Sequence, residues 1–356
     1  MALLYIDGFE EYDTNANNFW TEVSTTQPTN GVKVSYWYTN NSAGSTAQAR
    51  TSQNGVTAKS LFSSTNVIGY SIPTPGTLYF GFGIFCTSIQ SNWICGIASN
   101  IGNYYANNPS NGVRLIVNAN STLSVVNNNT SAVLGTSTGV VSSNAWFYVE
   151  VKYVFGSGTS GAIQVKVDNV DFINVTGIDT AGGAASVNTF YFQTSTTAYY
   201  DDFYICDNTG TTNNTFLGPI SVYTMVPTGN STPLNMTASS GLNYACVDEM
   251  PWNSTDYVTA TASGQTDMYT LSGLPGSLTA SSVSGVLVKA RSMKPTVNSG
   301  QAQLVVSNSA FTSYSSSRTI TQTSYISNWA TFELQPNGSA WTQADIGTMV
   351  AGIKIV

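Results

Sequence analysis

The sequence predicts an all-β chain of two sandwich domains. Short runs rich in Val, Ile, Tyr, Phe and Thr recur about every ten residues, and helical periodicity is nearly absent. Asn, Gly, Ser and Pro separate these runs, which is typical of an antiparallel sandwich. At 356 residues the chain is longer than one hydrophobic core usually serves, so two domains are expected.

The first domain is predicted over residues 1–210. Its clearest expected strands are 3–10, 32–39, 77–85, 93–99, 113–119, 145–155, 162–168, 189–195 and 198–207. The first and last of these strands both carry Asp beside aromatic residues. We therefore expect 3–10 to pair antiparallel with 198–207, which brings the two ends of the domain together.

The second domain is predicted over residues 211–356, as a smaller β-sandwich with one short helix. The boundary falls in 208–215, a polar stretch with no hydrophobic spacing. Expected strands follow at 257–262, 283–293, 302–308, 317–324, 329–336 and 352–356. The helix is expected at 342–352, where Thr342 can cap the amide of the third helical residue.

Composition limits the partners. Charged residues make up only 8% of the chain, against a usual value of about 25%, so Ser, Thr, Asn and Gly must cover the surface. The net charge is −7 and the few Lys and Arg are scattered singly, so no nucleic-acid partner is expected. The N-terminal apolar run is too short for a signal peptide, and no stretch reaches the roughly 18 apolar residues of a membrane span. We therefore expect synthesis in the cytoplasm and no membrane partner.

Four cysteines and the absence of histidine limit the chemistry. Cys86, Cys95, Cys206 and Cys246 are too widely spread for a disulfide framework, so we expect buried free thiols. A bridge between Cys86 and Cys95, which flank one predicted hairpin loop, is the alternative. Without histidine the chain lacks the usual general base near neutral pH and the commonest transition-metal ligand. No cofactor is expected.

Asp168 and Asp171 bracket Asn169 in a short polar turn between two predicted strands. They are candidate calcium ligands, although a calcium site takes about six to eight oxygen ligands. The alternative, which we favour, is that they are solvated groups at a hairpin end.

Asp201 and Asp202 are neighbours in one predicted strand. Alternation points them to opposite faces of the sheet, so they are not expected to form a catalytic pair. Together with Asp7 they form either a calcium or carboxylate site, or a set of caps on backbone amides that ties the ends of the domain together. We favour the caps.

A retaining glycosidase needs two carboxyl groups about 5 Å apart on facing strands. The densest acidic cluster, Glu10, Glu11 and Asp13, is not a run of that kind, and Glu150 stands alone in its strand, where it faces Lys152. We therefore predict that the chain is not an enzyme.

Aromatic side chains are the candidate contact residues. Where two rings are adjacent in a strand, one must face outward, and an exposed ring beside Asn and Ser could stack on a sugar. The alternative, which we favour, is that such rings cover core edges or a subunit interface. The candidates are Tyr36, Trp37, Tyr38, Tyr104, Tyr105, Tyr199 and Tyr200.

The order of several motifs resembles that of one family, the accessory virion proteins of tailed bacteriophages. The similar segments are MALLYIDGFEEYDT at the start, YYDDFYICDNTGTTNNTFLGPISVYTMVPTGN (199–230), NYACVDEMPWNSTDYVTATASGQTDMYTL (243–271), LVKARSMK (287–294) and GSAWTQADIGTMVAGIKIV (338–356). The resemblance covers most of the chain, and the ordered succession is more specific than any single segment. Pro219 replaces the acidic residue that usually follows Phe-Leu-Gly.

This resemblance implies a concanavalin/laminin-G-like jelly roll followed by a small β-sandwich, and it implies no catalytic residues. The implied function is that of a structural accessory protein of the virion, such as a capsid decoration or cement protein or a head fibre. Its expected partners are major capsid or tail proteins and copies of itself. The alternative is a tail-associated or fibre adhesin that binds host-surface carbohydrate through the jelly roll.

Overall fold

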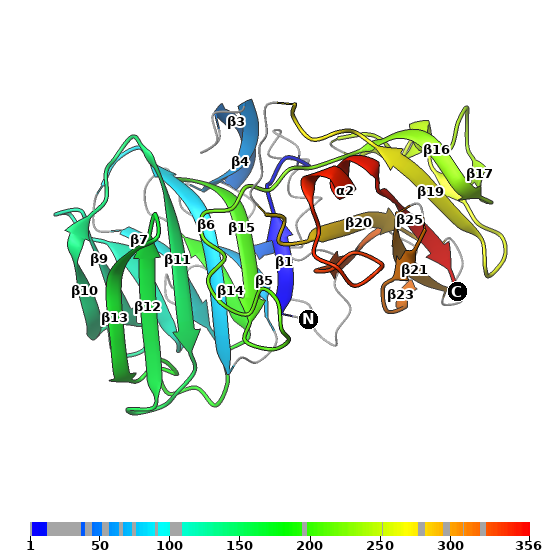
Figure 1. Cartoon of the computed structure of the whole chain (residues 1–356). Helices are drawn as coiled ribbons and strands as arrows, with labels where there is room; N and C mark the ends of the chain where they lie inside the picture. Colours follow the sequence, from blue (N-terminus) through cyan, green and yellow to red (C-terminus); the bar gives the residue numbers. More distant parts are fainter. Residues whose placement is uncertain are drawn as a thin grey trace. The chain divides into compact units, whose positions relative to one another are not determined.

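The computed structural model describes residues 2–12, 37–39, 45–51, 57–63, 67–72, 76–89, 92–99, 109–193, 198–250, 252–276, 282–294, 300–308, 310–320 and 325–356. They form two compact units, Met1–Val222 and Tyr223–Val356. Both are built almost entirely of β-strands, as Figure 1 shows, and this confirms the predicted fold class.

The first unit is a sandwich of two antiparallel sheets. The eight-stranded sheet has the order β13-β12-β11-β6-β15-β4-β3, with β1 paired to β15. Its strands are β1 (Leu3–Asp7), β3 (Ser45–Thr51), β4 (Thr57–Ser63), β6 (Thr77–Cys86), β11 (Trp146–Val154), β12 (Gly161–Val167), β13 (Val170–Ile178) and β15 (Ala198–Asp207). The seven-stranded sheet, in the order β10-β9-β8-β7-β14-β5-β2, contains β2 (Trp37–Thr39), β5 (Val67–Ser71), β7 (Asn92–Ala98), β8 (Val113–Val117), β9 (Thr122–Asn127), β10 (Val133–Val140) and β14 (Thr189–Gln193).

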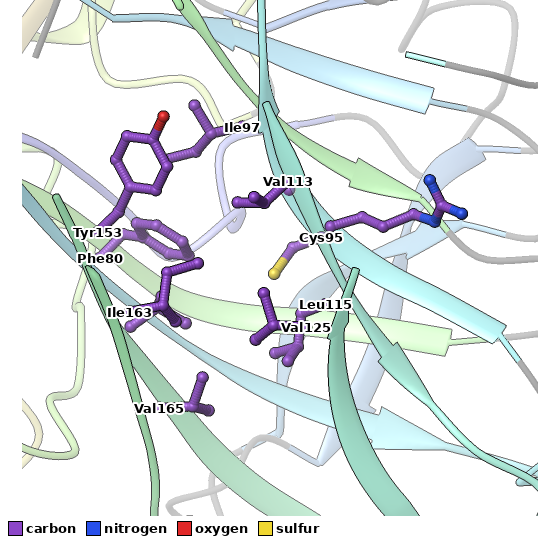
Figure 2. Close-up of a pocket in the computed structure, with 12 residues that line it drawn as sticks. Phe80, Cys95, Ile97, Val113, Leu115, Val125, Tyr153, Ile163 and Val165 are labelled. Carbon is purple, nitrogen blue, oxygen red and sulfur yellow. The ribbon is translucent and has the colours of Figure 1, made fainter. Parts of the chain in front are cut away.

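Alternate residues of the two sheets fill the space between them. Phe80 and Phe82 of β6 meet Phe190 and Phe192 of β14, with ring centroids 4.9 Å apart for Phe80 and Phe190 and 5.0 Å apart for Phe82 and Phe192. A cavity of about 20 Å³ remains in this core, and apolar side chains from both sheets line it (Figure 2). A space this small and apolar is a packing defect and not a ligand site.

Strand β1 pairs antiparallel with β15, which confirms the predicted pairing of the first and last strands. Leu3 lies opposite Cys206, and Asp7 lies opposite Phe203. The two ends of the jelly roll therefore meet in one sheet.

Residues 208–222, here called the strap, fold back over the outer face of the eight-stranded sheet. Phe216, Leu217 and Ile220 of the strap pack against a buried cluster of Leu3, Tyr79, Tyr148, Tyr204 and Cys206. The first unit therefore ends at Val222, whereas the boundary was predicted after residue 210. The polar stretch 208–215 resembles a linker, but the apolar residues that follow it belong to the first core.

Buried hydrogen bonds fasten the strap to the sheet. Glu150 Oε1 accepts the hydroxyl of Tyr204 at 2.5 Å and the amide of Gly218 at 2.8 Å. The Tyr204 hydroxyl oxygen accepts the amide of Leu217 at 3.2 Å. Burial, and then the Glu150 charge, raises the pKa of Tyr204 well above its ordinary value, so this hydroxyl stays protonated and remains a donor.

The second unit is a smaller set of antiparallel sheets. Its six-stranded sheet comprises β16 (Pro227–Leu234), β19 (Thr266–Leu271), β21 (Gly300–Ser307), β22 (Thr312–Tyr314), β23 (Arg318–Ile320) and β25 (Val350–Ile355). Two strand pairs accompany it, β20 (Val286–Ser292) with β24 (Ile326–Phe332), and β17 (Thr237–Ala238) with β18 (Val258–Thr259). The buried core of this unit includes Val306, Phe332, Trp341, Ile346, Met349 and Ala351.

Two short helices occur in the described part of the second unit, η2 (Tyr244–Cys246) and α2 (Gln343–Thr348). Helix α2 confirms the predicted helix and its cap, but the helix ends at Thr348 and not at 352, because strand β25 begins at Val350. The Thr342 side chain accepts the amide of Asp345, and the Asp345 carboxylate accepts the amide of Thr342, which makes a capping box. No helix among the described residues has the length and apolarity needed to cross a membrane.

Replacing Glu150 by Ala is expected to loosen the strap. The Tyr204 hydroxyl and the Gly218 amide both lose their buried acceptor, which should lower the free energy of unfolding of the first unit by about 2–4 kcal/mol. Hydrogen exchange should show lost protection at Gly218. Glu150→Gln is the matched control, because it keeps one acceptor oxygen and should lose less. Unchanged protection of the strap in Glu150→Ala would contradict this account.

Candidate functional site

The structure separates the adjacent aromatic candidates Tyr199 and Tyr200. Tyr200 is fully buried between the sheets, where its hydroxyl donates to the backbone oxygen of Ile94 at 2.9 Å. Tyr199 is half-buried on the other face, beside Phe85. One ring of the pair faces outward, as alternation requires, but predicting Tyr200 as a contact residue is wrong. The remaining candidates lie outside the described residues or in a strand whose side chains are not described: Tyr36, Trp37, Tyr38, Tyr104 and Tyr105.

Asp168 lies in the tight turn between β12 and β13, and Asp171 is the second residue of β13. Asp168 and Asn169 both have positive φ, 49° and 66°, as a two-residue turn of this kind requires. Asp168 Oδ1 accepts the amide of Tyr148 at 2.8 Å, and Asp171 Oδ1 accepts the side-chain amide of Gln164 at 2.8 Å. No group of three or more acidic, Cys or His side chains among the described residues could hold a metal ion. Both aspartates are exposed and accept hydrogen bonds at the end of this hairpin.

Asp7 is a buried acceptor at the end of β1. Its Oδ1 accepts the amide of Phe9 at 2.8 Å, and its Oδ2 accepts the hydroxyls of Tyr5 at 2.8 Å and Tyr12 at 3.1 Å. This is the capping role favoured from the sequence.

Asp201 and Asp202 lie in β15, as predicted, but a bulge shifts the register between Asp201 and Tyr204. Asp202 itself has a φ of 51°. The alternation on which the predicted opposite faces depend is therefore interrupted. Asp202 Oδ1 accepts the amide of Val222 at 2.7 Å, and Asp201 Oδ1 accepts the amide of Asp202 at 2.9 Å. These carboxylates cap amides and tie down the end of the unit.

One oxygen of each of two buried carboxylates, Asp201 Oδ2 and Glu150 Oε2, has no hydrogen-bond partner among the described residues. Burial, followed by the charges of Asp202, Glu10 and Asp7, raises the pKa of Asp201 to about 9. The Asp201 side chain is therefore protonated and neutral at pH 7, so it adds no charge to strand β15.

The cysteines confirm the prediction of buried free thiols: Cys86, Cys95, Cys206 and Cys246. Burial raises the pKa of Cys86 to about 12 and also raises that of Cys95. The reactive thiolate is therefore suppressed at both positions.

A polar cluster occupies the outer face of the seven-stranded sheet. Val113 and Leu115 point into the core (Figure 2), so alternation places Arg114 on the other face. One Arg114 guanidinium nitrogen donates to Asn128 Oδ1 at 3.2 Å, and the Tyr191 hydroxyl donates to the same oxygen at 3.5 Å. All three side chains are buried, so this cluster is not an open site among the described residues.

A groove of about 290 Å³ opens at the rim of the sandwich, between the end of β10 and the β12–β13 turn. We call it the rim groove. It is lined by Val140, Val141, Ser142, Ala145, Trp146, Phe147, Val167, Asp168, Val170 and Phe172. These residues come from two stretches of chain, 140–147 and 167–172, which meet in the folded sandwich.

Packing holds the two half-buried aromatic rings of the rim groove, Trp146 and Phe172. Trp146, the first residue of β11, contacts the Phe85 ring edge-on with centroids 5.8 Å apart. Phe172 lies against β10 at Gly139, where an added Cβ would come within 2.8 Å of the ring. Only glycine at this position lets the Phe172 ring approach the backbone so closely.

The rim groove combines apolar surface with few polar groups. Val140 is 62% exposed and Val170 is 61% exposed, and both Trp146 and Phe172 are half-buried. Asp168 is the one charged residue of the lining set, and Ser142 adds an exposed hydroxyl. Apolar walls with a small number of placed polar groups are typical of a small-ligand site. Of this set, only Asp168 is a candidate from the sequence.

Replacing Asp201 by Asn is expected to flatten the pH dependence of stability. The folded state keeps the Asp201 proton up to about pH 9, whereas the unfolded chain releases it near pH 4, so wild-type stability should fall as the pH rises between these values. The slope should be on the order of 1 kcal/mol per pH unit. Urea unfolding at pH 5, 7 and 9 measures it. Asp171→Asn, at an exposed carboxylate, should leave the slope unchanged. A slope in Asp201→Asn equal to that of the wild type would refute the claim that Asp201 is protonated in the folded state.

No protein-family model matches the chain, and no curated protein matches it. Solved structures with a similar fold include an alginate lyase of Aplysia kurodai (10% identity, 58% of this chain and 99% of that one, TM-score 0.42). Another is a carbohydrate-binding module, CBM66, of Bacillus subtilis (12% identity, 48% and 96%, TM-score 0.33). A third is a domain of an arabinanase of Geobacillus stearothermophilus in complex with arabinotriose (12% identity, 58% and 93%, TM-score 0.39). At these values the similarities carry no argument about function.

Proposed function

We propose that this chain is a non-catalytic binding protein, an accessory component of a tailed-phage particle whose jelly roll binds a host-surface glycan in the rim groove. The observation that carries the proposal is the groove itself, in which the rings of Trp146 and Phe172 and the polar groups of Asp168 and Ser142 line one open space. A sugar ring has an apolar C–H face and a rim of hydroxyls. Aromatic side chains fit the first and polar groups fit the second.

Three buried carboxylates are engaged in structural hydrogen bonds, and this supports binding over catalysis. Glu150, Asp202 and Asp7 hold strap or loop amides and tyrosine hydroxyls, and all three are buried. None of them lines the rim groove. A glycosidase would need two carboxyl groups facing one substrate.

A second function, attachment by protein–protein assembly, is favoured by the surface of the second unit. Among the described residues, large exposed apolar side chains are concentrated in this unit: Leu242, Met250, Tyr257, Met293, Phe311, Tyr314, Leu334 and Val356. Phe311 and Tyr314 lie in and beside β22, at one edge of the six-stranded sheet. Exposed rings at a sheet edge suit contact with a capsid or tail protein or with another copy of the chain.

Substitutions in the rim groove should weaken glycan binding. Trp146→Ala removes the main stacking ring and should weaken the best binder from a panel of bacterial surface oligosaccharides by about tenfold or more, measured by calorimetry. Val140→Asp places a carboxylate in the groove and should have a similar effect.

Val133→Asp is the matched control for Val140→Asp. Val133 lies in the same strand with nearly the same exposure, 61%, but outside the lining set, so binding should stay within about twofold. Glycan binding at wild-type affinity in both groove variants would contradict the site. Cleavage of a bound glycan would contradict the non-catalytic part of the proposal.

Assembly is tested by the solution mass of the purified protein over a range of concentrations. If the second unit mediates contacts, the wild-type protein should self-associate or bind phage particles that lack this protein. Phe311→Asp should reduce either association. Val133→Asp, at an exposed valine of the first unit outside the rim groove, is the control. A monomer with no affinity for such particles would exclude this second function.

A further inference from the structure

We infer that the rim groove selects neutral or amine-bearing sugars and rejects uronic acids and other anionic glycans, and that Asp168 sets this preference. The inference rests on the proposed function and names the ligand class of the same site. It follows from the charge, the size and the rigidity of the groove.

The charge of the lining set is −1. Asp168 is exposed and ionisable, and neither Lys nor Arg belongs to the ten lining residues. A ligand carboxylate held in the groove would therefore meet a like charge with no lining cation to offset it. At a separation of a few Å near a protein surface, this repulsion corresponds to about tenfold in affinity. The net charge of the chain, −7, acts in the same direction.

The basic residue nearest in sequence is engaged elsewhere. Lys166, two residues before Asp168, lies over the Phe216 ring of the strap with its ammonium 4.9 Å from the centroid. It also lies 3.9 Å from Asp171, outside the lining set. Lys166 therefore serves the strap and the hairpin and is not placed to bind a ligand carboxylate in the groove.

The size of the groove limits the ligand to a short segment. Its volume, about 290 Å³, is at the lower end of the range for small-molecule sites, about 300–1,000 Å³. One sugar unit with part of a second fills such a space. Recognition therefore depends on the charge of one or two sugar units.

The Asp168 carboxylate is fixed in place and is not a mobile surface charge. Its Oδ1 accepts the amide of Tyr148, and its backbone occupies the left-handed region in the hairpin turn. Asn also tolerates this conformation and also accepts an amide hydrogen bond through its side-chain oxygen. Asp168→Asn thus removes the charge while it keeps the turn and the contact with Tyr148.

The test compares matched glycosides by NMR titration of the whole protein. The probes are the methyl glycosides of glucose, galactose and N-acetylglucosamine, that of glucosamine, and those of glucuronate and galacturonate. At least one neutral glycoside should bind in a Trp146-dependent way, and its uronate counterpart should bind about tenfold more weakly at low salt. Asp168→Asn should bring the affinities for the neutral glycoside and its uronate counterpart within about threefold of each other. Asp171→Asn, three residues away and outside the groove, should leave the tenfold difference unchanged.

The outcomes separate the two proposals. A uronate that binds as tightly as its neutral counterpart, with both lost in Trp146→Ala, would overturn the charge preference and leave glycan binding in the groove intact. An unchanged ratio in Asp168→Asn would overturn the role of Asp168. If no glycoside binds, or if Trp146→Ala leaves the affinity unchanged, both the proposed function and this inference are overturned.

Discussion

The outer face of the eight-stranded sheet carries buried carboxylates, and backbone amides of the strap compensate two of them. Glu150 accepts the amide of Gly218 and Asp202 accepts that of Val222, so a segment without regular structure supplies the donors that these acids need. Burying a carboxylate without such donors costs several kcal/mol. The acids and the strap therefore depend on each other, because each would be unsatisfied without the other.

Strand β11 links this buried face to the rim groove. Its alternate residues on the outer face are Trp146, Tyr148 and Glu150, of which the first lines the groove and the last holds the strap. Tyr148 lies between them. Its amide donates to Asp168 of the groove, and its hydroxyl donates to the backbone oxygen of Asp202. Strand β11 thus connects the strap to Trp146 and Asp168, the two groove residues that are proposed to bind and select the ligand. Neither residue needs to move for this connection.

The predictable parts of this protein are those set by local pattern. The pairing of β1 with β15 and the capping box at Thr342 follow from residue types at short spacing, and both are confirmed. The bulge at Asp202 breaks strand alternation, and no local signal in the sequence marks it. The sequence predicts residues 211–222 of the strap in the second domain, because the stretch 208–215 is polar and has no hydrophobic spacing. The rim groove joins residues of two segments, 140–147 and 167–172, which come together only in the tertiary fold. The close approach of the Phe172 ring to the backbone at Gly139 also has no local signal in the sequence.

The outer face of the seven-stranded sheet and the rim groove both carry polar and aromatic groups, and they differ in solvent exposure. On the face of the seven-stranded sheet Arg114, Asn128 and Tyr191 are buried, whereas the rim groove is open and half-exposes its rings. The central claim is that a glycan occupies the second surface. A crystal structure of the protein with a bound neutral oligosaccharide tests it most directly. The account predicts a sugar ring against Trp146, within reach of Asp168, and a sugar seated over Tyr191 on the seven-stranded sheet would contradict it.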